Sequence, residues 1–465
     1  MEHARRRIER VARHALGFER LRPGQLEAAE AVVTGRDTLA VLSTGSGKSA
    51  IYEIAGLLLP GPTLVVSPLI ALQRDQVRAL HERALGAAPL NSAVSARDRA
   101  AALAELAEDA LEFLLLAPEQ LANEQVLADL VAARPSLVVV DEAHCISEWG
   151  HDFRPDYLRL GDAIAALDHP TVLALTATAG PLVREEIVER LGLRDPAIVV
   201  RGFDRPNIVL EVERFHEAHH KDQSLLERVA GSPRPGIVYA ATRRRTEELA
   251  QALAARGLAA RAYHAGLGRH DREAAERAFM GGELDAIVAT TAFGMGIDKP
   301  DVRWVVHAEI PESLDAYYQE LGRAGRDGEP AEAVLFYRPE DLGLRRFFAA
   351  GTEERRRAFE RSRLEMMPTY AETEEDCRRD VLLSYFGEPF DPPCGRCDNC
   401  RAGRVKPHDH VHEPYQVGSS VVHAEWGEGV VQRYDERAVV VLFASVGYKT
   451  LALDVVLERG LLTAS

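Results

Sequence analysis

The chain has 465 residues, of which 46% are hydrophobic and 28% charged, with a formal net charge of −16, and at ~150 residues per domain this length allows about three domains. The first twenty residues are charged, and no stretch approaches the ~18 consecutive apolar residues of a bilayer span, so we expect a cytoplasmic protein with no membrane partner. The acidic balance argues against a general polyanion binder, and any nucleic-acid surface should be a local basic groove.

The first predicted unit is a parallel β-sheet with helices between its strands. Short apolar runs recur with helical stretches between them: LAVLS at 39, TLVVS at 63, FLLLA at 113, LVVVD at 137 and VLALT at 172. A second set follows the breaker-rich GSPRPG at 231: GIVYA, RAYHA, DAIVATT, WVVHAE and EAVLFY. This alternation is typical of an α/β fold. The sequence therefore predicts two such lobes in succession, with GFDRPNI at 202 as the connector.

A glycine-rich segment, STGSGKS, follows the first predicted strand. Backbone N–H groups at Gly45 and Gly47 can surround a phosphate chain, and Lys48 can reach the terminal phosphates. The Ser49 hydroxyl can bind Mg²⁺. The strict form of this motif has glycine where Leu42 stands, so a glycine-rich turn without a ligand is the alternative.

The segment DEAH, residues 141–144, ends an all-apolar predicted strand. At the mouth of a parallel sheet, Asp141 can hold Mg²⁺ and Glu142 can orient and polarise the attacking water. A lone Asp-Glu pair that caps a helix is the alternative, but the interval from the GKS segment favours a nucleotide site. The next residues, CISEWGHDFRPDY from 145 to 157, have neither strand nor helix period. They predict an irregular loop with aromatic side chains.

The second lobe ends in YYQELGRAGRDG, residues 317–328. Arg323 and Arg326 are three residues apart, so we expect them to project from the same face of one helical turn. Surface arginines are often only solvated, but breaking the γ-phosphate bond calls for positive charge supplied from outside the phosphate loop. The sequence therefore predicts an ATPase site in the cleft between the lobes.

Four of the five cysteines lie within twenty-four residues at the spacing C-x16-C-x2-C-x2-C: Cys377, Cys394, Cys397 and Cys400. A secreted disulfide protein would not leave the rest of so long a chain with a single cysteine. The spacing indicates a metal site in a reducing compartment. It suits a structural Zn²⁺, and an iron–sulfur cluster, which also binds four thiolates, is the alternative.

The last part of the chain differs from the rest. Residues 403–416 have the composition of a linker, and residues 417–465 contain Val-rich runs separated by WGEG and YDER turns. This pattern predicts a small antiparallel barrel. Residues 403–465 hold six Lys and Arg against eight Asp and Glu, which favours a protein partner over nonspecific DNA contact.

Nine segments in chain order carry a family resemblance: GFERLRPGQ at 17, TGSGKS at 44, SPLIALQRDQV at 67, LAPEQL at 116, DEAHCISEWGHDFRPDY at 141, LTATA at 175, YHAGL at 263, TTAFGMGIDKPDVRWVVH at 290 and QELGRAGRDG at 319. This ordered set resembles the superfamily 2 helicases, and within them the RecQ family of DNA helicases, over residues 14–400. The cysteine quartet, with CRRDVLLSYFGE and CGRCDNC around it, is similar to the zinc module of that family.

The resemblance implies an α/β architecture of two tandem RecA-like parallel-sheet lobes, a helical zinc-binding module and a small C-terminal barrel of SH3/tudor type. The expected bounds are 1–208 for the ATP-binding lobe, 209–340 for the second lobe, 341–402 for the zinc module, 403–416 for the linker and 417–465 for the barrel. The barrel is similar to the small C-terminal domain of UvrD/PcrA-type helicases. The winged helix and terminal helical module that are usual in the RecQ family do not fit in the 65 residues after Cys400.

The resemblance also implies roles for single residues. The expected catalytic residues are Lys48, Asp141, Glu142, His144, Arg323 and Arg326. The expected ATP and Mg²⁺ contacts are Phe18, Arg22, Gln25, Thr44, Gly45, Ser46, Gly47, Lys48, Ser49, Asp298 and Gln319. The expected DNA-binding or coupling residues are Ser67, Gln73, Trp149, Phe153, Arg154, Thr176, Thr178, Arg243, Gly294 and Gly296. The expected ligands of a structural Zn²⁺ are Cys377, Cys394, Cys397 and Cys400.

The implied function is that of an ATP-dependent DNA helicase. It would move 3′ to 5′ on single-stranded DNA and unwind partially duplex DNA in repair or recombination, in a bacterial cytoplasm and at the nucleoid when acting. An RNA helicase, or a translocase that remodels junctions without processive unwinding, is the alternative. A third reading, in which the motor is an inactive scaffold and the C-terminal barrel carries the function, disagrees with the intact Lys48, Asp141 and Glu142.

Overall fold

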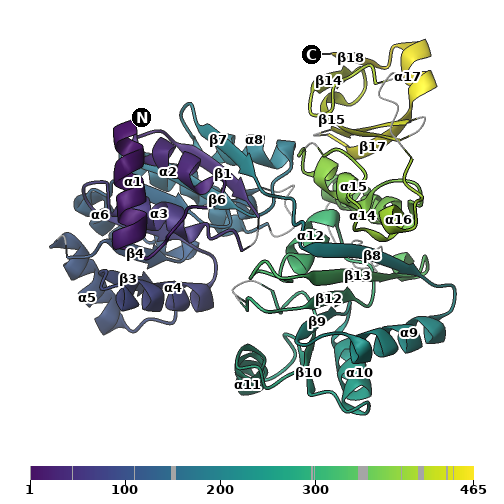
Figure 1. Cartoon of the computed structure of the whole chain (residues 1–465). Helices are drawn as coiled ribbons and strands as arrows, with labels where there is room; N and C mark the ends of the chain where they lie inside the picture. Colours follow the sequence, from purple (N-terminus) through teal and green to yellow (C-terminus); the bar gives the residue numbers. More distant parts are fainter. Residues whose placement is uncertain are drawn as a thin grey trace. The chain divides into compact units, whose positions relative to one another are not determined.

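The structure is a computed structural model that describes residues 2–464 except 44, 109, 148–152, 295–296, 298, 344–353, 389, 407–412, 436–437 and 444. The chain divides into two compact units, Met1–Phe203 and Asp204–Ser465, which Figure 1 draws in the order of the sequence from purple to yellow. Within the described residues, no helix is both long and apolar enough to cross a membrane.

The first unit is built on a seven-stranded parallel sheet in the order β3-β4-β2-β5-β6-β1-β7. Its strands are β1 (Thr38–Leu42), β2 (Thr63–Val66), β3 (Ala87–Leu90), β4 (Phe113–Leu116), β5 (Leu137–Val140), β6 (Thr171–Thr176) and β7 (Ala197–Arg201). The central strands are continuous apolar runs because helices cover both faces of such a sheet. The predicted parallel lobe is confirmed.

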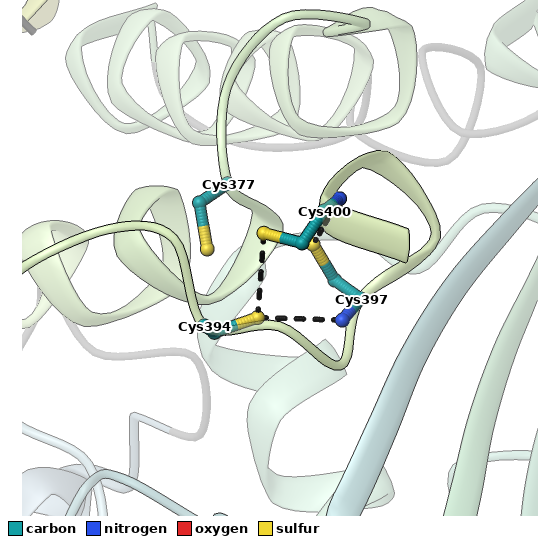
Figure 2. Close-up of side chains that lie close together, drawn as sticks. All are labelled: Cys377, Cys394, Cys397 and Cys400. Carbon is teal, nitrogen blue, oxygen red and sulfur yellow. Dashed lines mark hydrogen bonds between the residues drawn. The ribbon is translucent and has the colours of Figure 1, made fainter. Parts of the chain in front are cut away.

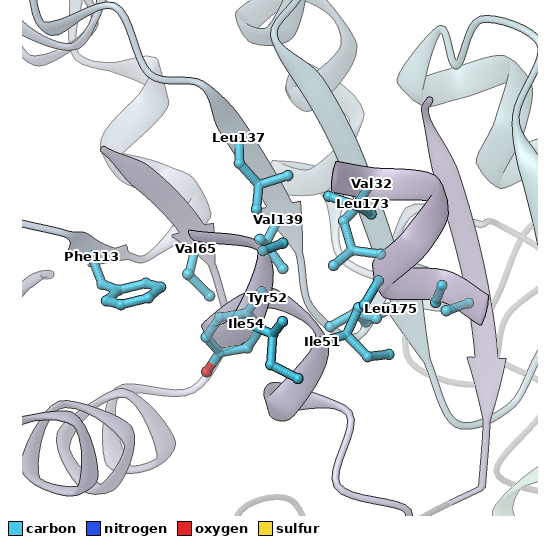
Figure 3. Close-up of a cluster of buried hydrophobic side chains, with 14 of the residues drawn as sticks. Val32, Ile51, Tyr52, Ile54, Val65, Phe113, Leu137, Val139, Leu173 and Leu175 are labelled. Carbon is cyan, nitrogen blue, oxygen red and sulfur yellow. The ribbon is translucent and has the colours of Figure 1, made fainter. Parts of the chain in front are cut away.

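Helices surround this sheet: α1 (Glu2–His14), α2 (Gln25–Val33), α3 (Ser49–Gly56), α4 (Ile70–Glu82), α5 (Ala96–Ala107), α6 (Glu124–Ala133), α7 (Leu160–Ala166) and α8 (Pro181–Leu191), with the short 3₁₀ turns η1 (Pro118–Ala122), η2 (Ala143–Ile146) and η3 (Pro155–Arg159). Figure 3 shows Ile51, Tyr52 and Ile54 of α3 packed toward the strands. The Tyr52 ring meets Phe113 edge-on, with the ring centroids 6.2 Å apart. This packing holds α3, and therefore the loop that precedes it, at the carboxyl edge of the sheet.

The second unit begins with a six-stranded parallel sheet in the order β10-β11-β9-β12-β13-β8. Its strands are β8 (Ile208–Arg214), β9 (Gly236–Tyr239), β10 (Ala260–Tyr263), β11 (Ala286–Ala289), β12 (Trp304–His307) and β13 (Ala331–Tyr337), and its helices are α9 (Ala218–Gly231), α10 (Arg243–Ala254), α11 (Arg269–Met280) and α12 (Leu314–Leu321). A Cβ on Gly236 would overlap the buried Trp304 ring, so only glycine fits there. The second predicted parallel lobe is also confirmed.

A helical module and an antiparallel sheet complete this unit. The module contains α14 (Glu354–Glu372), α15 (Arg378–Tyr385) and α16 (Asp398–Arg401). The sheet has the order β17-β16-β15-β14-β18 and consists of β14 (Ser420–His423), β15 (Gly427–Asp435), β16 (Ala438–Phe443), β17 (Gly447–Ala452) and β18 (Leu462–Ala464), with α17 (Leu453–Arg459) before its last strand. The predicted antiparallel β-structure is confirmed.

The antiparallel sheet packs on the helical module through a buried polar cluster. The backbone N–H of Tyr448 donates to the Ser362 hydroxyl over 3.1 Å, and the Tyr448 and Tyr385 rings stack with centroids 5.3 Å apart. The Tyr385 hydroxyl donates to Asp315 over 2.5 Å, and Arg363 pairs with the same carboxylate at 2.7 Å. Because these residues come from α12, α14, α15 and β17, the sheet is anchored to the second parallel lobe as well as to the helical module.

Candidate functional site

The glycine-rich loop joins β1 to α3 at the carboxyl edge of the first sheet. Gly45 and Gly47 have φ of +77° and +73°, a left-handed conformation that glycine adopts without strain. The Lys48 ammonium donates to the carbonyls of Leu42 at 3.2 Å and Ser43 at 3.5 Å. The Lys48 ammonium is thus held at the start of the loop, within reach of an anion that the backbone N–H groups of such a loop surround. Thr44 lies outside the described residues, and Ser49 is the first residue of α3.

Arg22 and Gln25 hold this loop from the segment before α2. The Gln25 amide nitrogen donates to the carbonyls of Ser46 and Gly47, both over 2.8 Å, and its oxygen accepts from the Arg22 backbone N–H at 2.7 Å. The Arg22 guanidinium donates to the Gly45 carbonyl. Sequence reasoning expected both residues to contact a nucleotide but missed this direct contact with the loop. To contact adenine, the Gln25 amide would have to give up some of these hydrogen bonds.

Phe18, the expected stacking ring, lies beside the same segment and is partly buried. The Arg83 guanidinium lies over one face of the ring, 5.2 Å from its centroid. Arg83 in turn pairs with Glu53 of α3 at 2.6 Å. A base could therefore stack on Phe18 only from the face that Arg83 does not cover.

Asp141 and Glu142 follow β5, which is separated from β1 by β6 alone. Asp141 is 7% exposed. Its pKa is raised to about 7, first because burial disfavours the carboxylate and second because Glu142 repels it, while Lys48 acts in the opposite direction. The two acidic groups and the lysine thus share one electrostatic environment, and a divalent cation would stabilise the ionised carboxylates there.

His144 links this acidic segment to the LTATA segment after β6. Its Nδ1 lies 2.9 Å from the Thr176 hydroxyl oxygen and 3.4 Å from a Glu142 carboxylate oxygen. The Thr176 hydroxyl donates to the Thr178 carbonyl over 3.1 Å and accepts from the Thr178 N–H. Since the hydroxyl proton points to Thr178, Nδ1 of His144 is the donor in the contact with Thr176. The expected coupling residue Thr176 therefore contacts the DEAH segment through His144, and Thr178 contacts Thr176.

The aromatic segment after DEAH is anchored at both ends, although Trp149 lies outside the described residues. The Arg154 backbone N–H donates to the Cys145 carbonyl, and its guanidinium donates to the Pro68 carbonyl at 3.3 Å. The buried Tyr157 hydroxyl donates to the Asp141 carbonyl over 2.9 Å. Tyr157 was not among the expected site residues, and no sequence signal separates it from an ordinary core tyrosine. Phe153, next to Arg154, is partly buried.

Ser67 and Gln73, both expected to contact DNA, are fully buried. The Gln73 amide donates to the Ser67 carbonyl and accepts from the Asn91 amide, both over 2.8 Å. Their side chains therefore shape the segment from inside, and a contact with DNA at this segment would come from its backbone or from neighbouring side chains.

The expectation that Arg323 and Arg326 share a helical turn is wrong. Helix α12 ends at Leu321, with Gly322 as its C-cap, and both arginines lie in the turns that follow. Gly325, with φ of +55°, adopts a left-handed conformation between them, which interrupts a helix. Arg323 is 7% exposed and Arg326 is partly exposed. Gln319 is partly exposed on α12 itself.

Two further expected DNA-contacting positions lie in the second unit. A Cβ on Gly294 would come within 3.1 Å of the Arg323 guanidinium, so this glycine packs directly against the arginine turn. Arg243 is the exposed first residue of α10, and its Cδ would lie 3.0 Å from a Cβ on Gly266 of the YHAGL segment. Gly296 and Asp298 lie outside the described residues.

The four cysteines of the helical module converge, as Figure 2 shows, and all their sulfur atoms lie within 4.8 Å of one another. The Cys394 and Cys400 sulfurs are 3.7 Å apart, close to the ~3.8 Å between thiolates bound tetrahedrally to zinc. Backbone N–H groups of Arg396 and Cys397 donate to the Cys394 sulfur. Contacts with the other thiols, together with these N–H groups, hold the pKa of Cys394 well below its usual range. The donor set therefore fits a four-thiolate metal ion.

Three family models match successive parts of the chain: a DEAD/DEAH box helicase domain over residues 22–186, a helicase conserved C-terminal domain over 220–328 and a RecQ zinc-binding domain over 339–401. The last match spans all four cysteines. It supports structural zinc at this cluster and removes the iron–sulfur alternative.

Curated relatives agree with these matches. The ATP-dependent DNA helicase RecQ of Pasteurella multocida is 42% identical over 88% of this chain, which spans 64% of that protein. The RecQ helicase of Bacillus subtilis is 39% identical over 90% of this chain and 70% of its own length. The chain thus covers slightly less than two thirds of the first relative and slightly more of the second.

A solved structure of the Mycobacterium smegmatis helicase Lhr bound to ssDNA and AMP-PNP is similar to this chain with a TM-score of 0.55 and 25% identity, over 71% of this chain and 48% of the other. The DUF1998 helicase MrfA bound to DNA and AMPPNP is similar with a TM-score of 0.59 and 21% identity, over 75% of this chain and 53% of the other. The likeness to MrfA concerns the fold alone.

Proposed function

Because the chain belongs to the RecQ family of ATP-dependent DNA helicases, we propose that it couples ATP hydrolysis to 3′–5′ movement on single-stranded DNA and to unwinding of partially duplex DNA in repair or recombination. The observation that carries the proposal is the meeting of Lys48 with the Asp141–Glu142 pair at the carboxyl edge of one parallel sheet. The protein would then act at the nucleoid.

In this proposal the loop residues Thr44 to Ser49 hold the phosphates of ATP, and Asp141 holds Mg²⁺ together with Ser49. When bound, Mg²⁺ neutralises phosphate charge and keeps the Asp141 carboxylate ionised. Glu142 orients the attacking water. Phe18, Arg22 and Gln25 recognise adenine beside the loop.

Arg323 and Arg326 of the second unit, together with Gln319 and Asp298, supply the contacts that stabilise charge on the transferred phosphate. Both arginines lie in the turns between Gly322 and Glu329, so a single movement of this segment would carry both guanidinium groups toward the phosphate. ATP binding and hydrolysis then open and close the motor. The path from this site to DNA runs through His144, which contacts both Glu142 and Thr176.

Single-stranded DNA is proposed to contact the backbone of the segment at Ser67 and Gln73, the residues Trp149, Phe153, Arg154 and Thr178, and in the second unit Arg243, Gly294 and Gly296. The anchoring of Arg154 at Cys145 and Tyr157 at Asp141 supports this assignment. A base that stacks on the aromatic segment could reposition Asp141 through a short covalent and hydrogen-bonded path. The aromatic segment is thus the proposed sensor of DNA.

The test is the rate of ATP hydrolysis with and without single-stranded DNA. We expect DNA to raise kcat by about tenfold or more in the wild-type chain, because bound DNA aligns the catalytic carboxylates. We expect Trp149→Ala to lose most of this stimulation while it still binds ATP. Full stimulation in Trp149→Ala would refute the sensor role.

The same assay with RNA of equal length separates the proposal from its alternatives. Stimulation by RNA equal to that by DNA would favour an RNA helicase. Stimulation by DNA without displacement of a strand from a partial duplex would favour a junction-remodelling translocase.

For the C-terminal sheet we propose an SH3/tudor-like barrel that binds a protein partner. Its described part carries several exposed apolar side chains, among them Val417, Val455 and Leu457, the last 56% exposed. Apolar groups at a surface favour a protein contact over a phosphate backbone.

We expect Leu457→Glu to leave the affinity for single-stranded DNA and the rate of ATP hydrolysis unchanged. The side chain is exposed on α17 and the change adds negative charge, so it would weaken DNA binding only if DNA passed over this sheet. Fluorescence anisotropy of a labelled oligonucleotide measures the affinity. A severalfold loss would assign DNA, not a protein, to this surface.

A further inference from the structure

The turn that carries Arg323 and Arg326 has no regular structure of its own after α12 ends at Leu321. Four of its carbonyl groups, those of Gly322, Ala324, Gly325 and Glu329, accept hydrogen bonds from side chains elsewhere in the second unit. The partners come from the first residues of this unit, Asp204–Asn207, which precede β8.

Arg205 supplies a fork of donors to the turn. One guanidinium nitrogen donates to the Gly322 carbonyl over 3.0 Å, and the other donates to the carbonyls of Ala324 at 2.8 Å and Gly325 at 3.0 Å. These carbonyls belong to the two residues that flank Arg323 and to the residue before Arg326. A planar guanidinium can bind several acceptors at once, which an ammonium cannot do in the same geometry.

Asn207 holds the far end of the turn. Its side-chain amide nitrogen donates to the carbonyls of Gly325 at 2.8 Å and Glu329 at 2.9 Å, and its backbone carbonyl accepts from the Ala331 N–H at 3.0 Å. The fit leaves no space, since a Cβ on Gly325 would overlap the Asn207 amide and lie 2.8 Å from the Glu329 carbonyl.

The segment that bears Arg205 and Asn207 is itself fixed from the helical module. Arg379 of α15 pairs with Asp204 at 2.6 Å and donates to the Ile208 carbonyl at 2.7 Å. Arg396, which stands between Cys394 and Cys397, donates to the Pro206 carbonyl at 2.6 Å. The segment that holds the arginine turn is thus itself bound by Arg379 and Arg396 of the helical module.

We propose that Arg205 and Asn207 are positioning residues, which hold the arginine turn in the conformation that ATP hydrolysis requires without contacting the nucleotide. This inference rests on the proposed function, in which Arg323 and Arg326 act on the phosphate. Small displacements of a positioned group lower a catalytic rate far more than they lower substrate affinity, so the two residues should set kcat and leave KM nearly unchanged.

The first test is Arg205→Lys in the full chain, with kcat and KM for ATP measured at saturating single-stranded DNA. Lysine keeps the charge but loses the fork, and we expect kcat to fall by between about tenfold and a hundredfold with KM changed less than twofold. Asn207→Ala, expected to act in the same direction, serves if Arg205→Lys fails to fold. A wild-type kcat in both variants would overturn the inference.

Arg214→Lys is the matched control. Arg214 also donates to several backbone carbonyls of the second unit, including those of Ala371 and Thr373, but they lie in the helical module. The control should lose as much thermal stability as Arg205→Lys and keep kcat. An equal loss of kcat in both would show a merely structural role for Arg205 and contradict the proposal.

The second test combines Arg205→Lys with Arg326→Ala. If Arg205 acts through the turn, Arg205→Lys should reduce kcat by a smaller factor in the Arg326→Ala background than in the wild-type chain, because one of the two arginines that it positions is gone. If each substitution instead lowered kcat by the same factor whether or not the other was present, the positioning role would be overturned while the proposed function stands. A wild-type kcat in Arg326→Ala would instead refute the arginine assignment on which both depend.

Discussion

Replacement of Lys48 by alanine should reduce ATP hydrolysis by at least about a hundredfold, the effect of removing a single preorganised charge from a phosphate site. Lys48 stands at the end of the curled loop, with its ammonium 3.2 Å from the Leu42 carbonyl, and it is one of the groups that lower the pKa of Asp141 against burial. Its loss would remove a phosphate contact and would also raise the pKa of Asp141 further, which weakens Mg²⁺ binding. Steady-state hydrolysis at saturating ATP and DNA measures the effect.

The control for Lys48→Ala is Lys406→Ala. Lys406 pairs with Glu375 at 2.5 Å on an exposed surface, where ion pairs contribute little to stability, and its replacement should leave hydrolysis unchanged. Equal rates for the wild-type chain and Lys48→Ala would mean that the glycine-rich loop is not the nucleotide site.

Removal of zinc should unfold the cysteine-bearing part of the second unit. Structural zinc contributes about 10–16 kcal/mol to folding in zinc-finger peptides, and here the thiols of Cys377 on one side and Cys394 to Cys400 on the other join α15 to α16. Cys397→Ser should lose bound zinc and lower the thermal midpoint of the second unit. Atomic emission and calorimetry measure the two effects.

Cys145→Ser is the matched control for the metal. Cys145 is fully buried in the first unit and is not a member of the cluster, so its replacement should leave the zinc content unchanged. Unchanged zinc in Cys397→Ser would exclude the four-cysteine site. Because Arg396 holds Pro206, zinc loss should also slow ATP hydrolysis even where the first unit remains folded.

Much of the architecture could be predicted because local patterns determine it. The apolar runs at 39, 63, 113, 137 and 172 became β1, β2, β4, β5 and β6, since short apolar runs between helices are typical of strands that helices cover on both faces of a parallel sheet. The cysteine spacing predicted a tetrahedral cluster for a similar reason, because ligands two residues apart reach one metal ion without help from distant parts of the chain.

The arginine turn shows where local patterns mislead. A separation of three residues predicted a shared helical face for Arg323 and Arg326, but Gly322 ends α12 and Gly325 is left-handed. The conformation after the helix depends on acceptors and donors more than a hundred residues away, at Arg205 and Asn207. No spacing rule within the turn contains that information.

The amino-acid sequence by itself determined which functional motifs the chain carries and in which order: the phosphate loop, the acidic pair, the arginines and the cysteines. Each motif is recognisable because its residues lie close together in the chain. Only the tertiary structure placed Gln25 on the loop, Tyr157 on Asp141, Arg205 on the arginine turn and Tyr448 on Tyr385. These contacts join residues that are distant in the chain, and they form because buried donors and acceptors must find partners wherever the packed sheets and helices bring them.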